Sequence, residues 1–359
     1  MASQLRDKEW AQDHLQGIEN QTMPSFTPGL DELDEEAIRW DVQHAIDQGF
    51  SSTLCTCEAG LEFEEAKRFV EIVVEEAGED IHVSTTLLFD SLDQNREMLA
   101  HGEEIGLDTA LLGYPLDWHP DSPGEVIEVS RDMIESTDVG VLLYPTPKFS
   151  FERFHPSGFP LSLLDELADL PNVIGAKIGK PDLMADVYNR VGDRLVISNP
   201  YETDAPANVM GFDMQFMGAG PYDVYQTPEK PRLVEYFDLL LEGEYDEALA
   251  LYWELKPIRE TFFQQMAPQF RVGTYHFPEH KYYQWLTGGN GGYTRQPAMA
   301  LSDQDKRSIR GAMQGAGLDL REDDAEFYAG RVNYDGDGEA SADAGDDGAV
   351  EAEQPAGDA

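Results

Sequence analysis

A repeating unit limits what this chain can fold into: a short apolar or β-branched run, then a turn, then an amphipathic stretch. Parallel strands need a crossover between them, so this rhythm is typical of a parallel sheet. The runs expected to be strands are residues 21–25, 51–55, 82–87, 109–113, 140–144, 173–177, 195–198 and 214–217. Apolar residues at three- and four-residue intervals predict helices at 34–48, 63–76, 92–104, 123–136, 161–168 and 180–190. Eight such units within about 220 residues predict a closed (β/α)8 TIM barrel of the α/β class.

Segments on either side of the barrel complete the expected organisation. Residues 1–16 are a polar leader and residues 17–228 the barrel. Residues 332–359 carry nine acidic and no basic side chains among mostly small residues, which predicts a disordered acidic tail. A C-terminal helical bundle over residues 229–320 would hold helices at 231–241, 245–265, 282–286 and 303–314.

The charge balance is strongly negative: 70 Asp and Glu against 25 Lys and Arg give a formal net charge of -45. Self-repulsion of this size destabilises a compact chain at low salt and keeps it hydrated where ions are dense, which predicts a halophilic organism. Disorder of the whole chain is excluded because 41% of the residues are hydrophobic and 10% are aromatic. A field of this sign repels nucleic acid and anionic membrane surfaces, so small metabolites are the expected partners.

Cysteine usage and hydropathy bear on where the protein works. Cys55 and Cys57 are the only cysteines, and a bridge across one residue would strain disulfide geometry, so a reducing compartment is expected. No apolar run reaches about 18 residues, and the N-terminal residues are mostly polar, so we expect neither a membrane span nor a signal peptide. The expected location is the cytoplasm.

The active site of such a barrel lies at the carboxyl ends of its strands, and the sixth expected strand ends on a lysine. The segment reads Gly175-Ala176-Lys177. A lysine inside an apolar strand is costly to bury charged, which favours the neutral, nucleophilic amine that Schiff-base chemistry needs. The alternative, a lysine that simply emerges into solvent, stays open on this pattern alone.

Two other strand ends supply candidate partners for Lys177. Tyr144 ends the fifth expected strand, so its phenol would lie within reach of the lysine, where it can move protons. A tyrosine in such a place is also common as a simple rim residue. The second strand leads into a turn around Thr56, whose hydroxyl and backbone N–H groups can hold a carboxylate.

These segments, in their order and spacing, resemble the dihydrodipicolinate synthase and N-acetylneuraminate lyase family. That family has Gly-Thr/Ser-Thr-Gly-Glu after strand two, Tyr-x-x-Pro after strand five and Gly-x-Lys at the end of strand six. The matching segments here are Leu54-Cys55-Thr56-Cys57-Glu58, Tyr144-Pro145-Thr146-Pro147 and Gly175-Ala176-Lys177. The likeness extends over residues 17–290.

The resemblance implies a class I, Schiff-base-forming aldolase or lyase. By it, Lys177 condenses with the C2 carbonyl of pyruvate or another 2-keto acid, and Tyr144 acts as acid and base. Thr56 would bind the carboxylate of the keto acid, together with Cys55 and Cys57 in the same turn. The protonated imine is the electron sink, so neither a metal nor a cofactor is expected. A homotetramer is expected because the family usually assembles in this way.

Departures from the family pattern argue against lysine biosynthesis. Leu54, Cys55 and Cys57 stand where the family has a glycine, a relay hydroxyl and a second glycine. In the family, a tyrosine after strand four completes a proton relay. The segment that follows Tyr114 in this chain has no tyrosine at that place. The arginine that binds the carboxylate of the aldehyde is replaced by Phe149.

Aromatic residues stand in place of these groups, and we expect them to form an apolar pocket for a bulky second substrate, as in hydratase-aldolases of the same family. Trp118 and Phe149 are the candidates for contact with that substrate. The alternative is that the aromatic residues only pack an enlarged loop or a subunit contact. The set is Trp118, Phe149, Phe151, Phe154 and Phe159.

Other functions stay open on the same scaffold. One is a 2-keto-3-deoxy-sugar-acid aldolase in which Arg153, Lys148 and His155 meet the sugar-acid carboxylate. Another is a Schiff-base dehydratase or decarboxylase, in which the imine loses water or carbon dioxide. A third is a barrel that has lost activity and binds a keto acid as a sensor.

Two further motifs carry little weight. His276 and His280 resemble an inverted zinc-protease pattern, but Pro278 is expected to break the helix that would place both histidines on one face. The glycine-rich run 287–292 follows a helix instead of a strand, which predicts a flexible connector and not a phosphate-binding loop.

Overall fold

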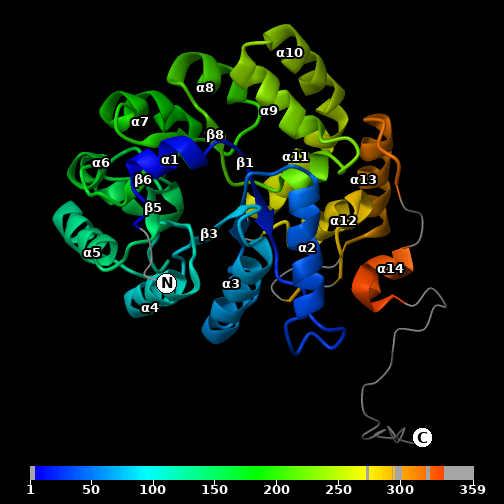
Figure 1. Cartoon of the computed structure of the whole chain (residues 1–359), viewed down its shortest axis with the longest axis horizontal. Coiled ribbons are helices and arrows are strands. Elements are labelled where there is room, and N and C mark those ends of the chain that lie inside the picture. Colours follow the sequence, from blue (N-terminus) through cyan, green and yellow to red (C-terminus); the bar gives the residue numbers. More distant parts are fainter. Residues whose placement is uncertain (1–4, 272–274, 293, 296–300, 321–323, 335–359) are drawn as a thin grey trace, which may run out of the picture.

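The predicted TIM barrel is confirmed. The structure is a computed structural model that describes residues 5–271, 275–292, 294–295, 301–320 and 324–334. Eight parallel strands pair in sequence order and close when β1 pairs with β8 (Figure 1). The strands are β1 Gly17–Thr22, β2 Ser52–Cys55, β3 His82–Thr86, β4 Thr109–Leu111, β5 Gly140–Leu143, β6 Val173–Lys177, β7 Val196–Ser198 and β8 Phe216–Met217.

A helix follows each strand and covers the outside of the barrel. The helices expected between the first seven strands lie within a few residues of their predicted bounds. They are α2 Glu35–Asp47, α3 Phe63–Ala77, α4 Leu92–Ile105, α5 Pro123–Glu135, α6 Ser162–Leu167 and α7 Met184–Val191. A further helix, α8 Ala205–Phe212, was not predicted, because Pro206 and Gly211 obscure its helical pattern. Among the described residues, no helix is long and apolar enough to cross a membrane.

The first strand was predicted several residues too late. It spans Gly17–Thr22, whereas residues 23–25 belong to the loop that follows it. Two causes combine: Glu19 and Asn20 are polar residues buried in the strand, and Pro24 cannot donate a hydrogen bond to a neighbouring strand. Barrel interiors can hold polar side chains, so a search for apolar runs misses such a strand.

The polar leader contains a helix, α1 Lys8–His14, that covers the amino-terminal end of the barrel (Figure 1). Asp7 caps it by accepting a hydrogen bond from the backbone of Trp10. Arg6 forms an ion pair with Asp108 at 2.8 Å, and Lys8 donates to the carbonyl of Ala168. Because both partners precede strands, the helix lies at the end opposite to the predicted site.

The C-terminal helices pack beside the barrel (Figure 1). The helix expected at 245–265 is divided at Leu255, since Pro257 can occupy the first turn of a helix but not its interior. Pro278 likewise begins a helix instead of breaking one, and ten of the eleven residues of that helix are buried. The helices are α9 Arg232–Glu242, α10 Tyr245–Glu254, α11 Lys256–Arg271, α12 Phe277–Thr287, α13 Asp303–Gly315 and α14 Asp324–Ala329.

Polar contacts fasten the C-terminal region to the barrel helices. Lys281 of α12 forms a fully buried ion pair with Asp41 of α2 at 3.1 Å. The glycine-rich connector is buried in part and hydrogen-bonded: Asn290 N donates to Asp41 Oδ1 at 2.6 Å. Residues 332–334, expected to begin the tail, are ordered, and Asn333 donates to Asp34 at 2.7 Å. The remainder of the predicted tail lies outside the described residues.

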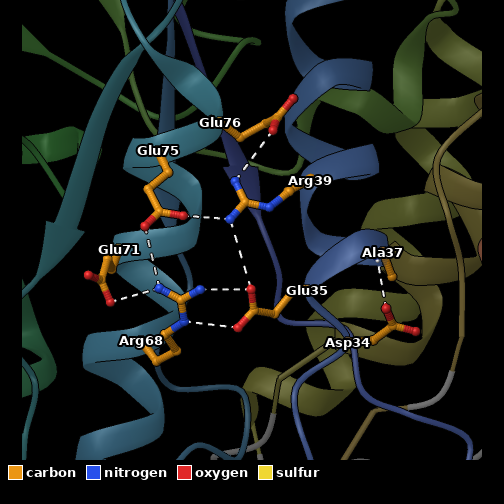
Figure 2. A network of polar contacts seen from close by, with 8 residues as sticks. All are labelled: Asp34, Glu35, Ala37, Arg39, Arg68, Glu71, Glu75 and Glu76. Carbon is orange, nitrogen blue, oxygen red and sulfur yellow. Dashed lines mark hydrogen bonds and ion pairs between the residues drawn. The ribbon is translucent and has the colours of Figure 1, made fainter.

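Helices α2 and α3 are joined by two arginines that each contact several carboxylates (Figure 2). Arg68 of α3 binds both oxygens of Glu35 on α2, at 2.9 and 2.7 Å. Arg39 of α2 reaches Glu75 and Glu76 on α3. Bidentate, networked pairs of this kind stabilise more than isolated surface pairs, although each is partly exposed to solvent and screened by salt.

Replacing Arg68 by alanine should lower the free energy of unfolding, because it removes the bidentate pair with Glu35 and leaves neighbouring carboxylates to repel one another. We expect a loss of about 1 kcal/mol at low ionic strength that shrinks in concentrated KCl. Urea unfolding at two KCl concentrations measures it. Arg307→Ala is the control, since Arg307 forms no ion pair among the described residues and hydrogen-bonds only to Gln304. Equal losses in both variants would exclude the network as the cause.

Candidate active site

A cavity of about 1050 Å³ opens at the carboxyl ends of the barrel strands. Its inner surface comes from strand ends and the loops that follow them, including Gln21, Thr56, Thr86, Tyr144 and Lys177. Catalytic sites of TIM barrels occur at this end, because loops after all eight strands converge there. The geometry therefore selects this cavity as the candidate active site.

Lys177 is the last residue of β6 and lies at the floor of the cavity. It is only 4% exposed, so the lysine does not simply emerge into solvent. Among the residues that the structure describes, it takes part in no ion pair within 4 Å. Its Nζ lies 5.4 Å from the ring centroid of Tyr144, so the amine and the phenol border the same part of the cavity.

Tyr144 follows β5 and is buried beside two lysines. Lys148 Nζ lies 5.8 Å from its ring centroid and donates to the hydroxyl of Tyr275 at 3.4 Å. Burial opposes ionisation of Tyr144, but the positive charges of Lys148 and Lys177 outweigh it and lower the pKa of the phenol. Partial desolvation acts in the same way against charged Lys148, although the residue as a whole is exposed, yet the nearby Tyr144, Glu58 and Tyr275 raise the pKa of its amine.

Thr56 lines the cavity and carries a hydroxyl with no partner among the described residues. Its backbone N–H donates to the carbonyl of Thr22, which holds the turn after β2 against β1. The side-chain oxygen is buried and makes no hydrogen bond within the described part of the chain. An orphaned buried hydroxyl costs free energy, so a ligand group that pairs with it gains a strong contact.

The two cysteines of this turn point elsewhere. Cys55 is completely buried in the core, and Cys57 contacts the hydroxyl of Thr85 at 3.6 Å; neither lines the cavity. Burial raises the pKa of Cys57 to about 12 and that of Cys55 well above its ordinary value. Both thiols are therefore neutral near pH 7.

The loop aromatic residues pack mainly on one another, although Phe149 also meets the ring of Tyr144 edge-on, with centroids 6.3 Å apart. Trp118 stacks on Tyr114 with ring centroids 5.1 Å apart, and Phe149 meets the edge of the same ring at 5.0 Å. The hydroxyl of Tyr114 pairs with Ser130 at 2.6 Å. Neither Trp118 nor Phe149 lines the cavity, which favours the packing alternative for them. Arg153 and His155 also bond within this region, to the Pro120 carbonyl and to Ser157.

An apolar wall that the sequence did not reveal comes from the C-terminal region. It faces the outer half of the cavity and is built from Phe262, Phe263 and Met266 of α11, with Tyr275 and Phe277 beyond it. The spacing of residues 262, 263 and 266 marks one face of a helix, a signal present in the sequence. That signal could not tell which part of the barrel the face would cover.

The two histidines near α12 form no evident metal site. His280 Nε2 pairs with Asp223 Oδ1 at 2.6 Å, and the ring of His276 stacks on that of His280 at 6.3 Å. Burial lowers the pKa of His276 to about 3, so its ring is neutral. Across the described residues, no three His, Cys, Asp or Glu side chains are grouped to hold a metal ion.

Solved structures of low sequence identity share this fold. N-acetylneuraminate lyase from Fusobacterium nucleatum superposes with a TM-score of 0.70 at 18% identity and covers 84% of this chain and 98% of its own. Dihydrodipicolinate synthase from Aquifex aeolicus gives 0.70 at 20% identity and covers 86% and 100%. The closed barrel and these likenesses define the fold class, a (β/α)8 barrel.

Sequence relatives give the family. A 4-hydroxy-tetrahydrodipicolinate synthase from Halorhodospira halophila is 26% identical over 297 residues, covering 80% of this chain and 91% of that protein. One from Methanopyrus kandleri is 24% identical over 263 residues, covering 71% and 83%. The family model described as "Dihydrodipicolinate synthetase family" matches residues 17–314, so the chain belongs to that family. It is a class I, pyruvate-dependent carbon–carbon lyase.

Replacing Lys148 by methionine should raise the pKa of Tyr144, because it removes the lysine that contributes more than Lys177 to lowering that pKa. We expect a shift on the order of one pH unit. Ultraviolet titration of tyrosinate, taken as the difference between each protein and its Tyr144→Phe version, isolates this phenol. Lys180→Met is the control, since Lys180 pairs with Asp182 and does not line the cavity. An unchanged midpoint in the Lys148 variant would contradict the assigned cause.

Proposed function

We propose that Lys177 is the Schiff-base lysine of this enzyme and that Tyr144 and Thr56 serve the same reaction. The observation that carries the proposal is their convergence on one cavity from three different strands. Lys177 offers a buried amine, Tyr144 offers a phenol of lowered pKa, and Thr56 offers an unpaired hydroxyl. The amine of Lys177 suits the carbonyl of a 2-keto acid, and the phenol of Tyr144 suits its reacting hydroxyl. The hydroxyl of Thr56 suits its carboxylate.

The reaction follows from these positions. The neutral amine of Lys177 adds to the C2 carbonyl, and loss of water leaves a protonated imine. Tyr144, as phenolate, accepts the proton of the C4 hydroxyl while the electron pair of the C3–C4 bond moves into the imine. An aldehyde leaves, the resulting enamine takes a proton at C3, and water hydrolyses the imine to release pyruvate. Thr56 holds the substrate carboxylate by its hydroxyl throughout.

The second half of the substrate is proposed to be bulky and apolar. The outer cavity is walled by Phe262, Phe263 and Met266, which favour burial of apolar surface. The expectation of an apolar pocket is thus kept, with α11 in place of Trp118 and Phe149. A synthase acting on a carboxylated aldehyde would instead need the arginine that Phe149 replaces.

Two alternatives on this scaffold differ in what supports them. A sugar-acid aldolase would use Lys148, which lines the cavity, but Arg153 and His155 are engaged elsewhere. A dehydratase, decarboxylase or hydratase-aldolase would begin from the same Lys177 imine and diverge only afterwards. Halophilic life, a cytoplasmic location and a tetrameric assembly stay predictions.

Incubation with pyruvate and borohydride at high salt should add a reduced pyruvyl group to Lys177, because borohydride traps the imine as a stable secondary amine. Peptide mass spectrometry locates the adduct. Lys177→Arg should abolish it, since the guanidinium remains charged, whereas Lys148→Met should still be labelled on Lys177. Absence of an adduct from the wild-type protein with every 2-keto acid tried would reject the Schiff-base proposal. Product analysis would then separate cleavage from dehydration.

Replacing Phe263 by alanine should weaken use of an arylidene 2-keto acid, because the exposed ring forms part of the apolar wall. We expect KM to rise severalfold, up to about tenfold, from the apolar area lost. Trapping of pyruvate, which does not reach the wall, should stay unchanged. Trp253→Ala is matched as a control, since Trp253 is equally exposed, at 62% against 60%, but lies outside the cavity. A sugar-derived 2-keto acid preferred by the wild type would contradict the apolar assignment.

A further inference from the structure

A carboxyl group is buried inside the barrel, below the floor of the cavity. Glu19 lies on β1 and is 3% exposed. Its Oε1 accepts hydrogen bonds from Ser52 Oγ of β2 at 3.1 Å and from Ser84 Oγ of β3 at 2.6 Å. A buried carboxylate is costly unless hydrogen bonds and a cation compensate it, so its place inside the barrel needs a reason.

The barrel is shaped to hold this carboxyl. Gly218 follows β8, next to β1, and a Cβ at this position would lie 2.6 Å from Glu19 Oε2. Any other residue would displace the carboxyl from its two serine partners. The donors on β2 and β3 and the missing side chain after β8 together form a cradle for Glu19.

A short path of contacts joins this cradle to Lys177. In register, Lys177 of β6 pairs with Ser198 of β7. Ser198 Oγ donates to the carbonyl of Gly218 at 3.1 Å and accepts from its N–H at 3.0 Å. Gly218 in turn lies against Glu19. The lysine and the carboxyl therefore belong to one polar layer that crosses β6, β7, β8 and β1.

The charges in this layer are few. Burial raises the pKa of Glu19, while the positive charge of Lys177 and the hydrogen bonds from Ser84 and Ser52 partly oppose the rise. Cys55 and Tyr222 also lie within electrostatic range of Glu19, but burial raises the pKa of each well above its ordinary value, so both are neutral. From the cavity side, Lys177 faces Tyr144.

We propose that Glu19 is a positioning residue whose carboxylate, held by the hydroxyls of Ser52 and Ser84, supplies a counter-charge for the cation that forms on Lys177 above it. This role of Glu19 rests on the proposed function, in which Lys177 forms the imine. The iminium nitrogen carries a permanent positive charge once the carbonyl oxygen has left as water, and a buried carboxylate across a low-dielectric layer stabilises that charge. No proton needs to pass through Glu19, because the group acts through its field.

The test compares Glu19→Gln with the wild type in borohydride trapping of pyruvate on Lys177. Without the carboxylate the iminium is less stabilised, so the initial rate of trapping at a fixed, subsaturating pyruvate concentration should fall by up to about tenfold. For the same reason, the pyruvate concentration that gives half-maximal trapping should rise about tenfold. Both quantities come from quantifying the adduct on the Lys177 peptide over time at a series of pyruvate concentrations.

Asp41→Asn is the matched control, because Asp41 is equally buried and paired with Lys281 outside the barrel. It should lower stability without moving either quantity. Ser84→Ala removes the shorter hydrogen bond to Glu19, so it should shift both quantities in the same direction as Glu19→Gln but by a smaller amount. If Glu19→Gln does not fold, Ser84→Ala tests the role of Glu19.

The outcomes separate this role from the proposed function. If the wild type is trapped by pyruvate but both quantities are unchanged in Glu19→Gln and Ser84→Ala, the proposed role of Glu19 is overturned. The Schiff-base proposal for Lys177 would then still stand. Equal shifts in Asp41→Asn would overturn the role of Glu19 too, by showing a general loss of structure. Failure of the wild type to form any adduct would instead reject the Schiff-base proposal itself.

Discussion

Closure of the parallel sheet is the constraint on which the rest of this structure depends. It is made by β1, which pairs with β2 on one side and with β8 on the other through Gly17 and Ile18. Because all eight strands run the same way, closure gathers their carboxyl ends into one ring. Thr56, Tyr144 and Lys177, far apart in the sequence, meet at one cavity for this reason. The same closure places Gly218 against Glu19.

The candidate reactive residues at the ends of strands could be predicted from the sequence. The polar residues buried in the middle of strands could not. Lys177 and Tyr144 follow apolar runs, so the pattern that marks the strand also marks where its side chains emerge. The family motif then paired them with Thr56. Glu19 escaped the same reasoning, because a buried carboxyl makes its strand look like a polar loop. Its partners Ser52 and Ser84 become meaningful only when the sheet is closed.

The cavity wall shows a second limit of reading the sequence. Aromatic residues after β4 and β5 lie close to the predicted catalytic motifs along the chain, yet Trp118 and Phe149 pack around Tyr114. The wall comes instead from Phe262, Phe263 and Met266, which lie about 90 residues beyond Lys177. Amphipathic spacing identified a helix face but not its partner. The partner appears only in the fold, where Phe262 meets the rings of His276 and Tyr283 with centroids 5.1 and 5.5 Å apart.

The large negative charge of the chain and an anionic substrate are compatible because the two kinds of charge are screened differently. Surface carboxylates such as those of Glu71 and Glu75 are exposed to salt, and their repulsion fades beyond a Debye length of about 10 Å at 0.1 M. Lys177 is buried in the cavity, where screening by mobile ions is weak, whereas Lys148 beside it is exposed. Salt therefore removes the long-range repulsion of a keto acid while leaving its local attraction. An acidic exterior and a cationic site support each other under the ionic conditions that the composition predicts.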